Sequence, residues 1–296
     1  MEKKNIVWQI TSRYALVTCI NNGRGIVVEK EIAPKVVNFG NAVWVNETSV
    51  YFRKKLHECK VSLAEPYVCF EKEGKAIQQS PYVGLDLEKI FQKEEVTQDI
   101  FNKLINVISG VLTQEIPQVG IDARLSNFCL GPNEDLYYVD TFPPLVKYKG
   151  EYIVHFPNPT NPGIVAQEFK RKFDPMGILR RLRFSVLEQD VGFSEKNILY
   201  ALGEILGNNF ATKTENYFQT FLDHMSVSDA FNQLTLNDPD GIRELALKFM
   251  PPKGEPREKF LKEIFELSSN FCPFTIPPEE RLKRIQELLS VHVNHY

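Results

Sequence analysis

The pattern of apolar residues changes partway along the chain, and this change limits the fold more than any other feature of the sequence. Short apolar runs at 6–10, 14–20 and 25–32 are typical of strands. Between residues 97 and 114 the apolar positions instead recur along one face of a helix. A sheet-rich first part followed by a mainly helical part predicts an α+β fold.

Two hairpins are predicted within the sheet-rich part. Asn22-Gly23 lies between the second and third apolar runs, which is a strong hairpin signal. A Gly-containing charged turn at 71–75 separates two further apolar runs in the same way. Pro81 and Gly84 then favour an extended connector. We therefore expect a small sheet-rich lobe over residues 1–83 and a mainly helical lobe over 84–296.

Helices are predicted on both sides of this connector. Ser49 to Lys60 has apolar residues at helical spacing, with Asn46 as the expected N-cap and Glu47 in the first turn. From residue 164 onward helical segments dominate. The prolines between 143 and 162 are expected to prevent regular structure over long distances.

Composition and charge exclude several classes of protein. A net charge of −3 gives no electrostatic reason to expect nucleic acid or an anionic membrane as a partner. No apolar run approaches the length of a membrane span, and the charged N-terminus shows no export signal. The cysteines are odd in number and scattered, which is typical of reduced residues in a cytoplasmic protein. They are Cys19, Cys59, Cys69, Cys129 and Cys272.

Three polar side chains stand beside short apolar runs in the middle of the chain. They are Asp122, Asn127 and Asp140. The runs at 128–130 and 137–139 are separated by a Gly- and Pro-containing turn, so they are expected to form a hairpin that brings Asn127 close to Asp140. Phosphoryl transfer uses an Asp for the acceptor hydroxyl and an Asn and an Asp for magnesium. The alternative is that these residues only cap turns and end a strand.

In order and spacing, these three residues resemble the catalytic loop and metal-binding segment of protein kinases. The similarity is closer to the aminoglycoside and choline phosphotransferase group of kinase-like small-molecule enzymes. That resemblance implies a two-lobed kinase-like fold using ATP and magnesium. Asp122 would orient the acceptor hydroxyl, Asn127 and Asp140 would hold magnesium, and Arg124 would steady charge on the transferred group.

The same resemblance implies roles for residues of the sheet-rich lobe. Lys30, on the third strand, would contact the nucleotide phosphates and pair with Glu47 of the following helix. Ser12 would donate its hydroxyl to a phosphate, because the turn between the first two strands has no glycine. Without the resemblance, Lys30 is a solvent-facing strand lysine between two glutamates, and Glu47 is an acidic residue that suits a helix N-terminus.

The sequence departs from the kinase-like pattern in two places. Gly120-Ile121 stands where the group has a His or Tyr ahead of the catalytic Asp, and Asp140 begins Asp-Thr-Phe. The first hypothesis is an ATP- and Mg-dependent phosphotransferase acting on a hydroxyl of a small molecule. The alternative is a catalytically inactive kinase-like protein that binds a nucleotide or a protein partner. Protein kinase activity is less favoured, because no Ala-Pro-Glu type segment follows Asp140.

Two basic clusters lie in the helical part, at 170–172 and 180–183. A run of this kind is usually one solvated face of a helix, and that is the prediction for both. The second interpretation is contact with an anion.

Overall fold

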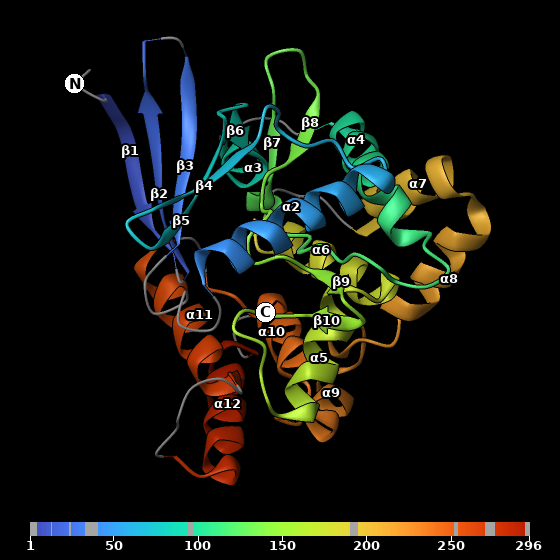
Figure 1. Cartoon of the computed structure of the whole chain (residues 1–296). Coiled ribbons are helices and arrows are strands. Elements are labelled where there is room, and N and C mark those ends of the chain that lie inside the picture. The colour runs from blue at the N-terminus through green and yellow to red at the C-terminus, as the bar shows by residue number, and fades with distance from the viewer. Residues whose placement is uncertain are drawn as a thin grey trace. The chain divides into compact units, whose positions relative to one another are not determined.

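The computed structural model of the chain (Figure 1) contains two compact units, Met1–Ala211 and Thr212–Tyr296. The predicted lobe boundary at residue 83 falls inside the first unit, so the division into lobes remains a prediction within that unit. The structure describes the following residues: 5–12, 14–23, 25–32, 41–93, 97–189, 195–251, 254–269 and 276–293.

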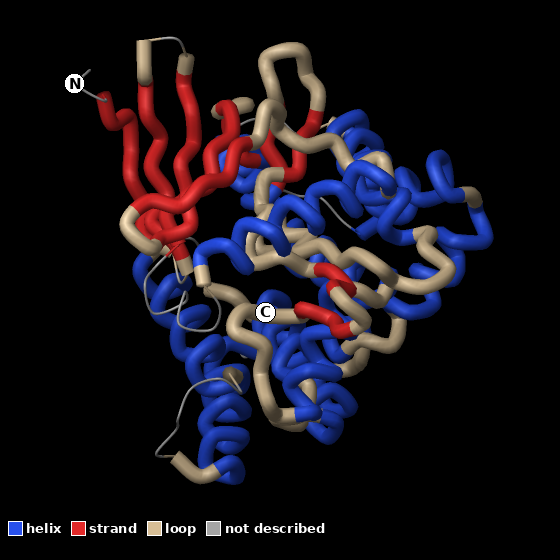
Figure 2. Tube along the Cα trace, in the orientation of Figure 1, coloured by secondary structure: helices blue, strands red, loops and turns tan. Residues whose placement is uncertain are grey.

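The first unit begins with a five-stranded antiparallel sheet, drawn as red tubes in Figure 2. Its order is β1-β2-β3-β5-β4, so β1 and β4 are the edge strands. Both predicted hairpins are confirmed, since β2 pairs with β3 and β4 pairs with β5. Glu73 and Gly74 turn the second hairpin with positive φ angles of 53° and 75°. The strands are β1 Asn5–Thr11, β2 Ala15–Asn21, β3 Ile26–Ile32, β4 Val68–Lys72 and β5 Lys75–Pro81.

Helix α2, Ala42–Glu58, connects β3 to β4 and packs against the sheet. Its buried side includes Val45, Phe52 and Leu56, none of which is exposed to solvent. The prediction that this helix begins at Asn46 is wrong. Asn41 is the N-cap, and its side chain accepts a hydrogen bond from the Trp44 N–H.

The predicted amphipathic helix is confirmed as α4, Gln98–Leu112, which buries Phe101, Leu104 and Ile108 completely. The predicted hairpin after Asn127 is also confirmed. Strands β7, Phe128–Leu130, and β8, Leu136–Tyr138, pair antiparallel. Together with β6, Leu85–Asp86, they form a three-stranded sheet in the order β6-β7-β8. Helix α3, Leu87–Lys93, follows β6, and the 3₁₀ turn η1, Leu125–Asn127, precedes β7.

A short hairpin lies among the prolines where little regular structure was expected. Strands β9, Val146–Tyr148, and β10, Glu151–Ile153, pair antiparallel. They are joined by Lys149 and Gly150, with φ angles of 50° and 90°. Three residues per strand suffice for pairing between prolines, so the prediction was too restrictive.

The rest of the first unit is helical, as predicted. Asn161 caps α5 and Asp174 caps α6, each by accepting a hydrogen bond from a glycine N–H in the first turn. The helices are α5 Pro162–Lys172, α6 Pro175–Leu187 and α7 Glu195–Leu206, followed by α8 Asn208–Phe218, which begins in the first unit and ends in the second.

The second unit is helical throughout its described part. Its core includes Ile242, Leu245, Ile264, Ile285 and Leu289, all fully buried. After α8 its elements are η2 Leu222–His224, α9 Val227–Gln233, α10 Pro239–Lys248, α11 Glu255–Ser268 and α12 Pro278–Val293. Among the described helices, none combines the length and the apolar character needed to cross a membrane.

Candidate functional site

The structure brings Lys30 of β3 to Asp140, which follows β8. The Lys30 ammonium Nζ lies 3.4 Å from Asp140 Oδ1 and 3.4 Å from the Val139 carbonyl oxygen, and donates to both. The side chains of Lys30 and Asp140 are 22% and 28% exposed. The five-stranded sheet therefore places its lysine against the end of the hairpin that carries the predicted metal ligand.

Asp140 sits where a negative charge is unfavourable in the absence of a further cation. Burial raises the pKa of Asp140, and the nearby charge of Asp122 raises it further. The ammonium groups of Lys30 and Lys172 lower this pKa, but the net direction is upward. A divalent cation at this carboxylate would reverse that balance, because it favours the ionised form.

Asn127 adjoins Asp140 through the backbone. The Val139 N–H donates to the Asn127 carbonyl oxygen at 2.9 Å, which continues the β7–β8 ladder by one residue. The Asn127 Nδ2 donates to the Asp122 carbonyl oxygen at 2.9 Å. This bond fixes the amide and leaves Oδ1 as the atom that can accept or ligate.

The oxygens of Asn127 and Asp140 fit magnesium, which prefers oxygen ligands and keeps several waters. They do not fit a site built by the protein alone. No cluster of three or more His, Cys, Asp or Glu suited to a metal ion occurs in the described part of the chain. A magnesium ion here would therefore need oxygens from a ligand, such as nucleotide phosphates, to complete its shell.

Asp122 is held from three directions. Arg181 of α6 contacts its Oδ1 through Nε at 3.4 Å, and Arg124 Nε lies 3.8 Å from its Oδ2. The Asp122 N–H donates to the hydroxyl oxygen of Tyr138 at 3.3 Å. Burial raises the pKa of Tyr138, so the phenol stays neutral and can accept this bond.

Arg181 and Tyr138 are contributions to the site that the sequence analysis missed. The second basic cluster was predicted to be a solvated helix face, and this is wrong for two of its members. Arg181 is 9% exposed, and Arg183 is 2% exposed and pairs with Glu195 at 2.7 Å. The signal that could have shown this is the apolar character of α6 on several sides, which is typical of a buried helix.

The predicted ion pair between Lys30 and Glu47 is absent from the described structure. Glu47 is exposed, whereas Lys30 pairs with Asp140. The α2 residue that contacts the sheet beside Lys30 is Ser49. Gln78, the β5 partner of Lys30 in the strand register, donates from Nε2 to Ser49 Oγ at 2.9 Å.

Ser12 uses its hydroxyl within its own turn. Its Oγ donates to the Ala15 carbonyl oxygen at 2.9 Å and accepts from the Ala15 N–H at 3.0 Å. It also accepts from the Tyr14 N–H at 3.4 Å. A phosphate contact by Ser12 would require these bonds to break. Arg13, in the same turn, lies outside the described residues.

The four described cysteines, Cys19, Cys59, Cys69 and Cys129, are free thiols. Burial raises the pKa of each, and raises that of Cys129 on β7 to about 12. None is therefore suited to act as a thiolate nucleophile. Cys272 lies outside the described residues.

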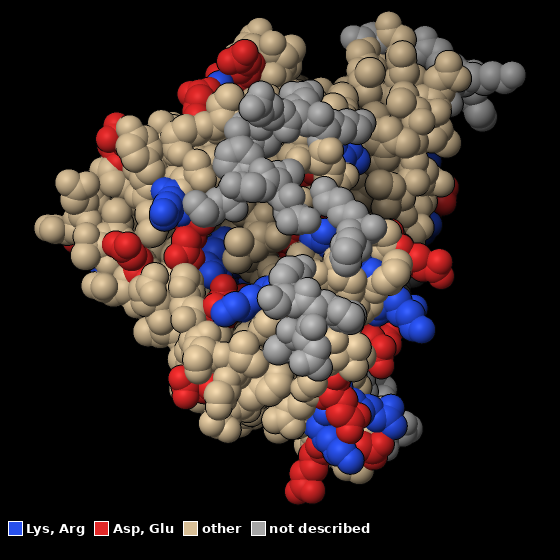
Figure 3. Space-filling model, turned by 180° about the vertical axis from the view of Figure 1, so that it is seen from behind, with Lys and Arg blue, Asp and Glu red and all other residues tan. Residues whose placement is uncertain are grey.

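Charged side chains are mixed in sign on the face that Figure 3 shows, where Lys and Arg lie next to Asp and Glu. This agrees with the small net charge of −3 and does not suggest a surface for nucleic acid.

Comparison with known proteins gives little beyond this geometry. No protein-family model matches the chain, and no curated protein matches it. Among solved structures, the PknI kinase domain of Mycobacterium tuberculosis and a point mutant of the same domain are similar to it. They are 11% and 12% identical, each with a TM-score of 0.37, covering 63% of this chain and 73% and 72% of theirs. This similarity is too low to assign an activity, so the function is inferred from the geometry of this chain.

Proposed function

We propose that the chain is an ATP- and Mg-dependent phosphotransferase that acts on a hydroxyl of a small molecule. The observation that carries this proposal is the contact of Lys30, in the five-stranded sheet, with Asp140, which follows β8 of the three-stranded sheet and lies far away in sequence. An ion pair with a purely structural role would not require Asn127 and Asp122 to lie close to Asp140 as well. Phosphoryl transfer does, because it depends on positioning and charge neutralisation.

Asp122 is the residue suited to orient the acceptor hydroxyl and accept its proton. Arg181 holds one carboxylate oxygen and Arg124 lies near the other. Arg124 is half exposed, so it is also able to reach a transferred phosphoryl group. Removing one charge-stabilising contact of this kind typically costs about a hundredfold to a thousandfold in rate.

Asn127 and Asp140 are the residues that would hold magnesium, and the ion would neutralise charge on the nucleotide phosphates. Lys30 would add a second positive charge to those phosphates. Its ammonium already lies at the Asp140 carboxylate, so phosphates bound beside that carboxylate are within its reach. Because ATP is a cytoplasmic metabolite, we place the activity in the cytoplasm.

The second candidate is a kinase-like protein without activity that binds a nucleotide or a protein partner. Two observations favour it. Glu47 does not pair with Lys30, and the β1–β2 turn has no glycine and engages Ser12 internally. Backbone amides in that turn have less freedom to approach phosphate oxygens.

Thermal unfolding with ATP and magnesium, followed by assay on a panel of small alcohols, separates the candidates. A ligand present at about a hundredfold over its Kd stabilises the folded state by about 2.7 kcal/mol. The phosphotransferase proposal predicts a magnesium-dependent rise in Tm, lost in Asp140→Ala, together with transfer to at least one alcohol. A rise without transfer favours the inactive nucleotide binder. No rise favours a kinase-like protein that binds a protein partner.

A further inference from the structure

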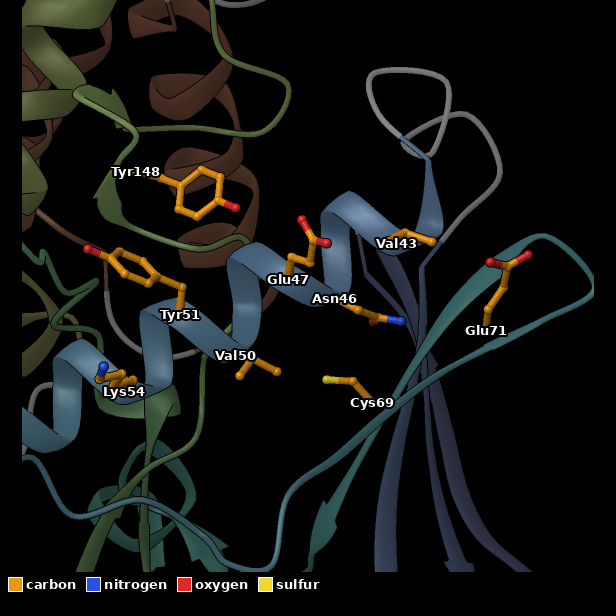
Figure 4. Close-up of a pocket in the computed structure, with 9 residues that line it drawn as sticks. All are labelled: Val43, Asn46, Glu47, Val50, Tyr51, Lys54, Cys69, Glu71 and Tyr148. Carbon is orange, nitrogen blue, oxygen red and sulfur yellow. The ribbon is translucent and has the colours of Figure 1, made fainter.

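A groove of about 600 Å³ opens between α2 and the edge strand β4, and nothing in the proposed reaction uses it. Figure 4 shows Asn46 and Val50 pointing from α2 toward Cys69 of β4. Tyr51 and Tyr148 of β9 lie at the side of the helix, with ring centroids 5.3 Å apart. The groove is lined by Val43, Asn46, Glu47, Val50, Tyr51, Lys54, Cys69, Glu71 and Tyr148.

The surface around this groove is apolar and exposed. Val43 is 50% exposed and Val50 is 52% exposed, although a helix packed on a sheet usually keeps polar residues on its outer side. Val43 and Val50 both line the groove. Apolar residues that gather in this way mark a binding surface more often than single exposed ones do.

The wall formed by β4 has the geometry for accepting a further strand. β4 ends the sheet and pairs only with β5 within the described structure, so its outer backbone groups carry no strand partner there. Cys69 and Glu71 alternate along β4 and both line the groove. Side chains of a strand added beside β4 would therefore enter the groove at every second residue.

The polar groups of the groove define the partner. Glu47 lines the helix wall and Glu71 the strand wall, and neither carboxylate has an ion-pair partner among the described residues. Lys54 lies at the other end of the groove, next to Tyr51 in Figure 4. The buried Asn46 Oδ1 also has no hydrogen-bond partner in the described part of the protein. Apolar walls with two unpaired carboxylates match a strand whose groove-facing side chains, at every second residue, include both apolar and basic ones.

We propose that this groove binds an extended segment of a partner protein, which adds to the sheet along β4. Its apolar side chains would pack against Val50 and Cys69, and a basic side chain would reach Glu71. Main-chain hydrogen bonds to the edge strand would provide affinity, and the alternate side chains would provide specificity. This proposal does not depend on phosphotransferase activity.

The test uses a fluorescein-labelled peptide of about seven residues, a length that spans an edge strand. Isoleucine and arginine take turns at every second position, so that both face the groove, and threonine fills the positions between them. Fluorescence anisotropy is the readout, and a matched peptide with glutamate in place of each arginine is the charge control. The arginine peptide is expected to bind the full chain, and the glutamate peptide is expected not to bind. A third peptide, N-methylated at alternate residues on the side facing β4, is expected to lose binding because it cannot pair with the strand.

Substitutions in and beside the groove test whether the peptide binds there. Glu71→Lys should weaken binding of the arginine peptide by roughly fivefold to tenfold, as expected when a partly exposed ion pair becomes a repulsive pair. Glu73→Lys is the matched control, because Glu73 is in the same hairpin but does not line the groove. This variant should bind the arginine peptide with the affinity of the wild type. Val50→Arg should abolish binding, with circular dichroism confirming that the variant is folded.

Three results would overturn the proposal. Equal binding of both peptides would show that charge in the groove plays no part. Equal losses in Glu71→Lys and Glu73→Lys would show non-specific attraction to the hairpin. Self-association that Val50→Arg abolishes, measured by sedimentation velocity without peptide, would show that a second copy of this chain covers the groove.

Discussion

Replacing Asp140 by asparagine is expected to make the protein more stable while removing its function. Burial and the charge of Asp122 raise the pKa of Asp140 in the folded protein. The attraction between Lys30 and Asp140 lowers this pKa, but it does not outweigh the effects that raise it. Asparagine keeps the shape of the side chain and removes the charge, so it removes a cost that the folded state carries.

The gain in stability can be expressed as a free energy of unfolding and as a change in Tm. Relief of an unfavourable charge commonly adds about 0.5–2 kcal/mol to the free energy of unfolding. For a cooperative unit the size of Met1–Ala211, each kcal/mol raises Tm by about 2–4 °C. We therefore expect Asp140→Asn to unfold a few degrees above the wild type at neutral pH without ligand.

The pH dependence has a definite sign. The cost at Asp140 is fully present above its raised pKa in the folded protein. It fades as the pH falls through that value toward 3.8, the ordinary pKa of the carboxyl group. Below 3.8 the carboxyl is protonated in both the folded and the unfolded state. The stability gained by Asp140→Asn should therefore be largest at neutral pH and shrink as the solution is acidified.

The assay is thermal unfolding by circular dichroism from acidic to neutral pH, with and without ATP and magnesium. Asp99→Asn is the control, because this carboxylate is 63% exposed. An Asp140→Asn variant less stable than wild type at neutral pH would refute the reasoning, because the ion pair with Lys30 would then outweigh burial. Nucleotide should raise the Tm of the wild type and leave that of Asp140→Asn unchanged.

Four further predictions follow from the site and the core. Asp122→Asn should lower kcat by at least about a hundredfold while the Tm rise with ATP and magnesium remains, measured by coupled assay and thermal shift. Lys30→Met should weaken nucleotide binding, measured by calorimetry. Unchanged affinity would show that Lys30 does not contact the nucleotide. Glu47→Gln should leave kcat and KM within about twofold of wild type, since the residue does not contact Lys30. A large loss of activity would instead support the predicted ion pair between Glu47 and Lys30. Phe52→Ala, in the fully buried face of α2, should lower the free energy of unfolding in urea by about 3–5 kcal/mol, whereas a loss below about 1 kcal/mol would mean that α2 does not pack as described.

Local signals explain what the sequence predicted correctly. Asn22-Gly23 and Gly74 select tight turns, so they determine which strands pair without reference to the rest of the fold. The proximity of Asn127 to Asp140 follows from one hairpin between them. The long apolar stripe of α4 is likewise a property of a single segment.

The errors concern features that depend on distant parts of the chain. Asn41 and Asn46 are equally good N-caps in isolation, and the packing of α2, which buries Val45 and Ser49, leaves Glu47 exposed. The burial of Arg181 depends on the packing of α6, and its contact with Asp122 joins residues that no local pattern relates. Tyr138 was identified only as part of a strand, because its hydrogen bond to the Asp122 N–H depends on how the chain folds back.

The most direct test of the central claim is a crystal structure with a non-hydrolysable ATP analogue and Mn²⁺ in place of Mg²⁺. Anomalous scattering locates manganese independently of the protein atoms. We predict a manganese peak about 2.1 Å from both Asn127 Oδ1 and an Asp140 carboxylate oxygen, with Lys30 on a phosphate of the analogue. A peak elsewhere, or an analogue bound without contact to Asp140 and Lys30, would contradict the assignment of this site.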